Sequence, residues 1–148
     1  MSDLSMERLR AYAAWWEALT PESVTAGRAL LAPGVRFKDP FQDIAGVDRV
    51  EAMLRHMFAA IEEPRFRTLD AALGTSAGYL RWRFTGRRRG AGPGTPGFAI
   101  EGMSEVAFDA TGRVAAHIDH WDAASQVYES VPVLGAVLRL AKRRAAGG

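Results

Sequence analysis

The chain has 148 residues, of which 48% are hydrophobic, and its 19 lysine and arginine residues against 17 aspartate and glutamate residues leave a formal net charge of +2. This length and composition are typical of one globular domain with a sizeable core. Because the chain has no cysteine, it can form neither a disulfide nor a thiolate metal site. No apolar run approaches the roughly 20 residues of a membrane-crossing helix, and the first residues lack the features of a secretory signal. We therefore expect a cytoplasmic protein.

Two local clusters of basic residues stand out against this small net charge. One is Arg87–Arg89, and the other consists of Arg139 with Lys142–Arg144. Neither is interleaved with aromatic side chains, as a stacking platform for single-stranded nucleic acid would be. We therefore expect no nucleic-acid partner.

The first predicted element is an amphipathic helix over residues 5–19. Its apolar residues fall at helical spacing and form one stripe: Leu9, Tyr12, Ala13, Trp16 and Leu19. Trp15 lies beside this stripe, next to Tyr12 one turn back. We interpret Trp16 as a core residue and keep Tyr12 and Trp15 as candidates for the lining of a pocket.

The next residues have the pattern of a second helix start. Thr20 offers a capping hydroxyl, Pro21 suits the first helical position, and Glu22 places an acid in the first turn. We predict a helix from Thr20 to about Leu31, which residues 32–34 (Ala-Pro-Gly) then break.

Residues 35–40 alternate apolar and charged side chains, which predicts a strand that ends at Pro40. Val35 and Phe37 should point inward, and strand alternation places the Asp39 side chain on the same side. A carboxylate at the inward end of a strand must be paired or hydrated, because burying a lone charge is costly. Asp39 is therefore either an acid/base group or the solvated carboxylate of an Asp-Pro turn.

Residues 47–63 show the clearest helical periodicity, and Pro64 should end this helix. Its apolar face is formed by Val50, Met53, Leu54, Met57, Phe58 and Ile61. His56 lies off the centre of that face, so we interpret it as a surface histidine.

The remaining pattern up to residue 122 predicts four strands. They are residues 65–73, 79–85, 98–108 and a last strand that ends in the polar segment 117–122. Leu80, Trp82 and Phe84 alternate with Arg81 and Arg83, and Ser104 shares a face with the apolar residues of its strand. The glycine- and proline-rich residues 86–97 predict a flexible surface loop.

The segment 117–122 holds two of the three histidines and two carboxylates. Strand alternation places His117, Asp119 and Trp121 on one face and the residues between them on the other. If the first face is buried, an imidazole and a carboxylate meet in an apolar wall and form a plausible acid/base site. The alternative is an edge strand whose polar residues face water. Because His117 and His120 lie on opposite faces, they cannot readily chelate one metal, and we expect no metal.

Residues 123–129 predict a short helix, and residues 133–144 a second one with Leu134, Val137, Leu138 and Ala141 on one face. The cations near its C-terminal end complement the helix dipole. Such a basic amphipathic helix can bind a membrane surface. We interpret it instead as docked on its own domain or on a partner subunit, without a membrane.

Helices grouped against a mainly antiparallel sheet predict an α+β fold, and a strongly curved sheet would leave a conical cavity for a small molecule. We expect one domain over residues 1–148, with its core at about 5–130 and a C-terminal amphipathic basic helix and tail at 131–148. The element order, the strand end at residues 37–40 and the ending at residues 112–122 resemble the SnoaL-like, ketosteroid-isomerase-like (nuclear transport factor 2-like) superfamily. This resemblance implies a cone-shaped, strongly curved sheet wrapped around the N-terminal helices. It leaves the chemistry open, because the superfamily includes isomerases, cyclases, dehydratases, epoxide hydrolases and proteins without enzymatic activity.

The resemblance implies roles for several residues. Asp39 matches the general base of ketosteroid isomerases, whose oxyanion-hole tyrosine and aspartic acid fall here on Trp15 and Ser104, two weaker donors. Asp119 looks like the acid/base aspartate of SnoaL-like cyclases and limonene-type epoxide hydrolases. The latter also use an arginine and a second aspartate, and the matching strand offers Arg81 and Arg83 without an aspartate.

Two functions remain open at this point. The first is a cofactor-independent isomerase, cyclase or dehydratase that acts on an apolar, ring-bearing ketone, polyketide or terpenoid. Asp39 or Asp119 would be the base, His117 would shuttle the proton, and an oxyanion would be bound by Ser104, Tyr12 or Trp15. Further expected pocket residues are Phe37, Met57, Trp82 and Trp121. The second function is a non-catalytic small-molecule-binding or oligomerisation module, and the relatives imply a homodimer through the outer sheet face.

Overall fold

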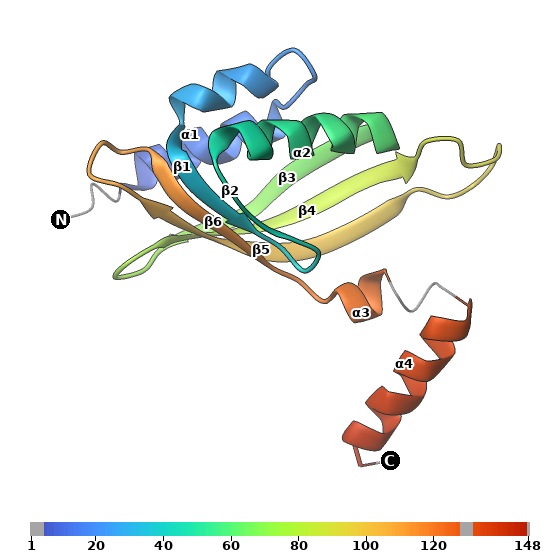
Figure 1. Ribbon diagram of the computed structural model, residues 1–148. Helices are drawn as coiled ribbons and strands as arrows, with labels where there is room; N and C mark the ends of the chain where they lie inside the picture. The colour runs from blue at the N-terminus through green and yellow to red at the C-terminus, as the bar shows by residue number, and fades with distance from the viewer. Residues whose placement is uncertain (1–4, 128–131, 148) are drawn as a thin grey trace.

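The computed structural model describes residues 5–127 and 132–147, which form one curved sheet with the N-terminal helices on its concave side (Figure 1). In chain order the elements are α1 (Met6–Glu17), the 3-10 helix η1 (Val24–Ala29), β1 (Leu31–Lys38), β2 (Asp43–Ala45), α2 (Val47–Ala60), β3 (Ile61–Leu73), β4 (Gly78–Arg88), β5 (Phe98–Phe108), β6 (Val114–His120), α3 (Ala123–Gln126) and α4 (Pro132–Ala145). The α+β fold predicted from the sequence is confirmed.

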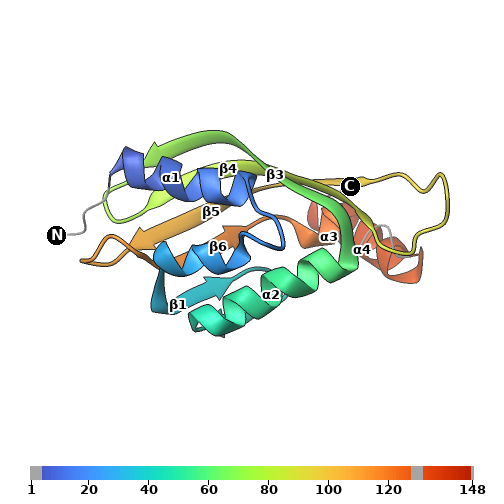
Figure 2. The same ribbon diagram turned by 90° about the horizontal axis from the view of Figure 1, so that it is seen from above.

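The six strands follow the order β2-β1-β6-β5-β4-β3. All neighbouring pairs are antiparallel except β1 and β6, which run parallel. Viewed from above, α1 and α2 both cross the same face of the sheet (Figure 2). A sheet that curves over two helices can pack its narrow part against them and leave its wide part open.

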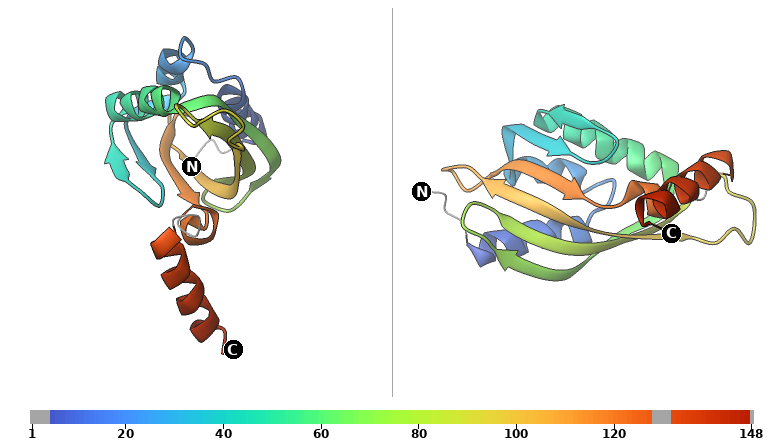
Figure 3. Two further views of the ribbon diagram at one scale, coloured as in Figure 1. Left: turned by 90° about the vertical axis from the view of Figure 1, so that its right-hand side faces the viewer. Right: turned by 90° about the horizontal axis from the view of Figure 1, so that it is seen from below.

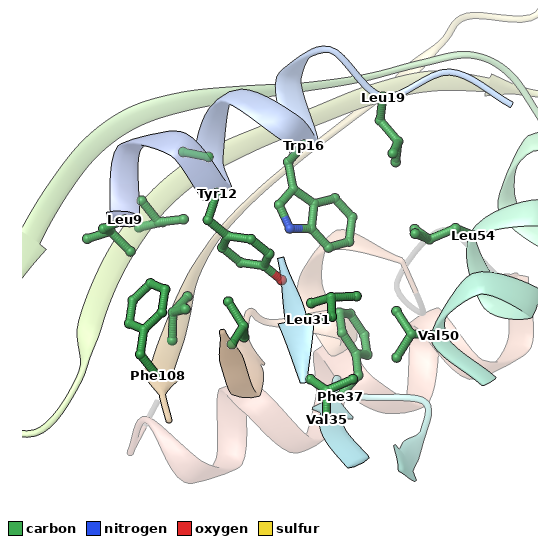
Figure 4. Packing of buried hydrophobic residues seen from close by; sticks show 14 of the residues in the cluster. Leu9, Tyr12, Trp16, Leu19, Leu31, Val35, Phe37, Val50, Leu54 and Phe108 are labelled. Carbon is green, nitrogen blue, oxygen red and sulfur yellow. The ribbon is translucent and has the colours of Figure 1, made fainter. Parts of the chain in front are cut away.

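The core fills the narrow part, where α1 and α2 face the inner surface of β1, β6 and β5 (Figure 4). Helix α1 begins at the N-cap Ser5, whose hydroxyl accepts from the amide of Arg8 at 3.1 Å. Its stripe is buried as its spacing predicts. The side chains that meet it in the core include Leu31, Val35, Phe37, Val50, Leu54, Val106, Phe108 and Val114.

The prediction of a helix over residues 20–31 is wrong. Thr20 and Ser23 bind each other instead: the Thr20 amide donates to Ser23 Oγ at 2.8 Å, and the Ser23 amide donates to Thr20 Oγ1 at 3.2 Å. These bonds belong to a tight turn, in which the Ser23 amide also donates to the Thr20 carbonyl at 3.0 Å. Only the 3-10 helix η1 follows, and β1 starts at Leu31, so the segment expected to break a helix lies inside a strand.

Several element ends also differ from the sequence prediction. Helix α2 ends at Ala60, three residues early, and Glu63 has a positive φ of 50° where the chain enters β3. The arginines at the end of β4 belong partly to the strand, which continues to Arg88. The short strand β2 was missed because three residues carry too little periodicity to detect.

After β6 the chain leaves the sheet on the side away from α1 and α2, and α4 extends outward from the body (Figures 1 and 3). Lys142 Nζ donates to Ser125 Oγ at 2.6 Å. Val137 and Leu140 remain 58% and 44% exposed, so this part of α4 does not dock on its own domain as one of our two interpretations expected. In the ranges that the structure describes, no helix combines the length and apolarity needed to cross a membrane.

Candidate functional site

The wide part of the cone encloses a cavity of about 680 Å³. Its walls come from α2, the ends of β1 and β6, the strands β3 to β5, and α3. Most lining side chains are apolar, among them Phe37, Met53, Met57, Phe66, Trp82, Phe84, Phe98, Ile100 and Trp121. The polar lining residues are Asp39, Gln42, His56, Arg88, Asp119 and Gln126. Such a mostly apolar cavity with a few polar groups is the usual form of a small-molecule site.

A second, smaller cavity of about 30 Å³ adjoins the inner end of the large one. Trp16, Phe66, Trp82 and Asp119 line both cavities. The small cavity also reaches Ser104 and His117. The small cavity is large enough for about one water molecule. Because Asp119 lines both cavities, a ligand in the large cavity would have Asp119 at its inner end.

Five side chains from four elements form a hydrogen-bond chain at this inner end. Their contacts are Trp82 Nε1 to Ser104 Oγ at 2.8 Å, Ser104 Oγ to Asp119 Oδ1 at 2.5 Å, Asp119 Oδ1 to His117 Nε2 at 2.7 Å, and His117 Nδ1 to the Tyr12 hydroxyl at 2.8 Å. We call these five residues the Asp119 network.

Strand register explains how most of the network assembles. Ser104 on β5 lies directly opposite Asp119 on β6, and Leu80 of β4 lies opposite Ser104 on its other side. Trp82, two residues further along β4, therefore points to the same face. His117 precedes Asp119 by two residues and stacks on Phe37 with ring centroids 4.7 Å apart.

The chemistry of the partners fixes the direction of each hydrogen bond. An indole N–H can only donate, so Ser104 accepts from Trp82 and gives its own proton to Asp119. Burial raises the pKa of Tyr12 well above its usual range, an effect that the nearby Trp16 N–H partly offsets, so Tyr12 keeps its proton. That proton has only His117 Nδ1 to bind among the described residues. His117 therefore accepts at Nδ1 and donates from Nε2 to Asp119.

Both donors thus converge on one oxygen of Asp119. Across the described part of the chain, no group donates to the second oxygen, Oδ2. The Asp119 side chain is 14% exposed, whereas His117 and Ser104 are buried to 4% and 2% exposure. The network therefore holds Asp119 by Oδ1 and leaves Oδ2 available at the inner end of the large cavity.

Asp39 lines the large cavity but takes no part in the Asp119 network. Its carboxylate accepts from the amides of Phe41 and Gln42 at 2.8 and 3.0 Å and from Gln42 Nε2 at 3.0 Å. These are the contacts of the turn interpretation, in which an aspartate caps the backbone two and three residues ahead. The structure brings Asp39 and Asp119 to the same cavity in different hydrogen-bond environments.

Of the two tryptophans of α1, Trp16 packs in the core as expected, whereas Trp15, a candidate for the pocket lining, does not reach the cavities. Trp15 borders neither cavity: its indole N–H donates to the Ser23 carbonyl at 3.3 Å, and its ring covers Gly27, where a Cβ would lie 2.4 Å from it. Trp16 borders both cavities while also packing in the core. Its Nε1 is buried without a hydrogen-bond partner in the described ranges, and Figure 4 shows this nitrogen on the side of the ring nearest the Tyr12 hydroxyl.

The three candidates for an oxyanion donor are all engaged elsewhere. Ser104 donates to Asp119, Tyr12 donates to His117, and Trp15 donates to Ser23. Arg81 and Arg83, the possible counterparts of the epoxide-hydrolase arginine, lie on the outer sheet face and pair with Glu101 at 3.6 and 2.6 Å. In the described residues no group of three histidine, aspartate or glutamate side chains is placed to hold a metal ion.

Sequence reasoning missed several lining residues, of which Arg88 is the most informative. It shares a face of β4 with Trp82 and Phe84 by strand alternation, but we expected that strand to end at Thr85 and placed Arg88 in a loop. The signal was present in the spacing of residues 82, 84 and 88. It was hidden because Gly86 interrupts the apolar pattern.

Residues 12–117 match the sequence model of the SnoaL-like domain, so the chain belongs to this family. The match ends at His117, two residues before Asp119. The resemblance to the SnoaL-like and nuclear transport factor 2-like superfamily is confirmed. No curated protein matches the sequence.

Solved structures show the same fold. A hypothetical protein from Catenulispora acidiphila with a ketosteroid isomerase-like fold, solved with trimethylamine, has a TM-score of 0.68 at 18% identity, covering 84% of this chain and 92% of its own. A protein from Shewanella denitrificans assigned as a SnoaL-like polyketide cyclase has a TM-score of 0.67 at 18% identity, with coverages of 83% and 98%. A protein from Mycobacterium tuberculosis described as an LEH-like epoxide hydrolase has a TM-score of 0.66 at 19% identity, with coverages of 82% and 87%.

Proposed function

We propose that the protein is a cofactor-independent enzyme that uses Asp119 as a general base on an apolar, ring-bearing ketone, polyketide or terpenoid. The observation that carries this proposal is the asymmetry of Asp119, whose Oδ1 receives two hydrogen bonds while Oδ2 receives none from the described residues. A base needs an accessible lone pair held in a fixed direction. The names of related structures, which include a cyclase and an epoxide hydrolase, agree with small-molecule chemistry.

The proposed reaction starts when the substrate places a C–H group next to its carbonyl against Oδ2. The proton moves to Oδ2, and the electron pair of the broken C–H bond forms an enolate. Asp119 then returns the proton to another carbon or to a leaving hydroxyl. Isomerisation, cyclisation and dehydration differ mainly in where the proton goes, so one carboxyl group can serve each of them.

The network gives His117 a positioning role in this scheme. Its Nδ1 is occupied by Tyr12 and its ring is buried, so it orients the carboxylate through Nε2 more readily than it exchanges protons with a substrate. The enolate oxygen needs a different donor. Trp121 lines the cavity, and its indole N–H has no hydrogen-bond partner within the described segments, so we propose Trp121 for that role.

The proposal is tested by turnover of cyclic enones and of polyketide-like ketones by the wild type, Asp119→Asn and Asp39→Asn. We expect Asp119→Asn to lose about 100-fold or more in rate, as for a lost general base. Asp39→Asn should lose far less, because Asp39 serves its turn. Equal turnover by all three proteins would remove both aspartates from the mechanism.

A second candidate is a non-catalytic small-molecule-binding module. It is favoured by the engagement of Ser104, Tyr12 and Trp15 in structural hydrogen bonds, which leaves none of them for an oxyanion. This module would bind apolar ring ketones with similar affinity in the wild type and in Asp119→Asn, and neither protein would convert them.

We also propose a homodimer through the outer sheet face. Met103 is 46% exposed there and lies on β5 between Glu101 and Glu105. An exposed apolar side chain among charges is compatible with a contact between two copies. Light scattering should show a dimer, and a monomer at high protein concentration would contradict it.

A further inference from the structure

We infer that the large cavity takes an elongated ligand with a carboxylate at the end remote from Asp119, and that Arg88 binds this carboxylate. The inference names a substrate class for the proposed enzyme and rests on that proposal for the chemistry at the inner end. The binding of the carboxylate itself can be measured without any turnover.

The arginines around β4 differ in their protein partners. Arg81 and Arg83 pair with Glu101, Arg87 pairs with Glu62 at 2.6 Å, and Arg89 donates to the carbonyls of Ala59 and Phe58 at 3.1 and 3.2 Å. The guanidinium of Arg88 has neither an ion pair nor a hydrogen bond to any described residue. It is also the arginine of this group that lines the large cavity. The cation without a protein partner is therefore the one that a ligand can reach.

Arg88 and Asp119 line the same cavity from distant positions on the sheet. Leu80 of β4 lies beside Ser104, and Ser104 lies beside Asp119. Arg88 is eight residues beyond Leu80 on the same face, which corresponds to about 26 Å of extended strand. Arg88 and Asp119 nevertheless line the same cavity. Trp82 and Phe84 form the apolar wall between the two charges.

The charged side chains that line the cavity are unevenly distributed along it. Both lining carboxylates, Asp39 and Asp119, come from the ends of β1 and β6, whereas Arg88 pairs across the sheet with Ile61 at the start of β3. His56 also lines the cavity and lies one helical turn before Ala60, whose carbonyl accepts from the amide of Arg89. The cavity thus has a carboxylate, Asp119, at its inner end and a guanidinium, Arg88, at its outer end.

This polarity would orient a ligand that carries one negative charge. A carboxylate is repelled by Asp119 and attracted by a guanidinium that can bind both of its oxygens. An exposed ion pair alone adds little to affinity, but here the apolar walls hold the rest of the ligand in place. The ketone end would then be directed toward Oδ2 of Asp119.

The test compares two probes that share a ring system and differ in charge, 4-(1-pyrenyl)butyrate and 4-(1-pyrenyl)butan-1-ol. Trp16, Trp82 and Trp121 line the cavity. Binding of each probe to the full chain can therefore be followed by fluorescence energy transfer from these tryptophans to the pyrene ring. We expect the wild type to bind the butyrate about tenfold more tightly than the alcohol, as for a charged hydrogen-bonded pair. Arg88→Gln should abolish this preference and leave the affinity for the alcohol unchanged.

Arg87→Gln is the matched control, because Arg87 is the neighbouring arginine, pairs with Glu62 and does not line the cavity. It should retain the preference for the butyrate. Equal affinity of the wild type for both probes, or a preference that survives in Arg88→Gln, would overturn the inference. Absence of butyrate binding to the wild type would overturn it as well. Asp119→Asn should keep the preference, so a failure at Arg88 is distinguishable from a failure of the proposed chemistry at Asp119.

Discussion

His117 and Asp119 lie two residues apart on β6, and their side chains meet with 2.7 Å between Nε2 and Oδ1. The opposite nitrogen of the same imidazole is held by Tyr12, 105 residues earlier in the chain, at 2.8 Å. The ring therefore links the core helix α1 to the carboxylate at the inner end of the cavity. A change in the core at Tyr12 should reach Asp119 through His117.

Replacing His117 tests this link. In His117→Phe the ring can still stack on Phe37, but the Tyr12 hydroxyl loses its acceptor and Asp119 loses a donor. A buried hydroxyl without a partner costs about 1–3 kcal/mol, so the free energy of unfolding should fall by that amount. Urea denaturation measures this loss. Any turnover should fall by roughly 10- to 100-fold, because the carboxylate is no longer held in one direction.

The double variant Tyr12→Phe/His117→Phe is the control for that experiment. It removes the stranded hydroxyl together with its acceptor, so it should be more stable than the sum of the two single losses predicts. Strictly additive losses would show that the two side chains do not interact.

The buried hydroxyl of Tyr12 predicts a loss of stability at alkaline pH. Its pKa in the folded protein is raised above the usual value of 10.0 by burial. Above about pH 10 the unfolded chain therefore releases this proton while the folded chain keeps it, and the free energy of unfolding falls as the pH rises. Urea denaturation between pH 8 and 11 should show that the free energy of unfolding falls more steeply with pH for the wild type than for Tyr12→Phe. If the free energy of unfolding fell equally with pH in both proteins, the buried Tyr12 hydroxyl would not be the cause of the loss.

Gly102 predicts a steric effect on the cavity. A Cβ there would lie 2.7 Å from the Trp82 ring and 2.9 Å from Trp121 Cβ, and both tryptophans line the cavity. Gly102→Ala should lower the free energy of unfolding by about 1–3 kcal/mol, as for an overpacked site, and should weaken binding of the pyrene probes. Gly34→Ala is the matched control, because no atom lies within 4 Å of its added Cβ. An equal effect of the two substitutions would show that the contact with the tryptophans is unimportant.

Much of the fold could be predicted from local pattern alone. The stripe of α1, the apolar face of α2 and the alternation in β5 each place buried side chains at the expected spacing. Residues 20–31 defeated the same reasoning, because Thr20 and Ser23 can cap a turn as readily as they cap a helix. The parallel pairing of β1 with β6 was also not predictable, because single-strand patterns carry no information about pairing partners.

The candidate site could be predicted only in part for a related reason. Period two places His117, Asp119 and Trp121 on one face, and it places Ser104 on the inner face of its own strand. The contact between Tyr12 and His117 depends on how α1 crosses the sheet, which local spacing does not encode. Asp39 shows the reverse case, since its face was predictable while the hydrogen bonds that occupy its carboxylate were not.

Proton exchange measures the central claim most directly, because it follows the base at Asp119 without knowledge of the final product. A cyclic enone or other ring ketone is incubated with the protein in D₂O, and deuterium at the carbon next to the carbonyl is followed by NMR. We predict exchange with the wild type and a loss of about 100-fold or more with Asp119→Asn, while Asp39→Asn stays near the wild type. Exchange at the wild-type rate in Asp119→Asn would contradict the account.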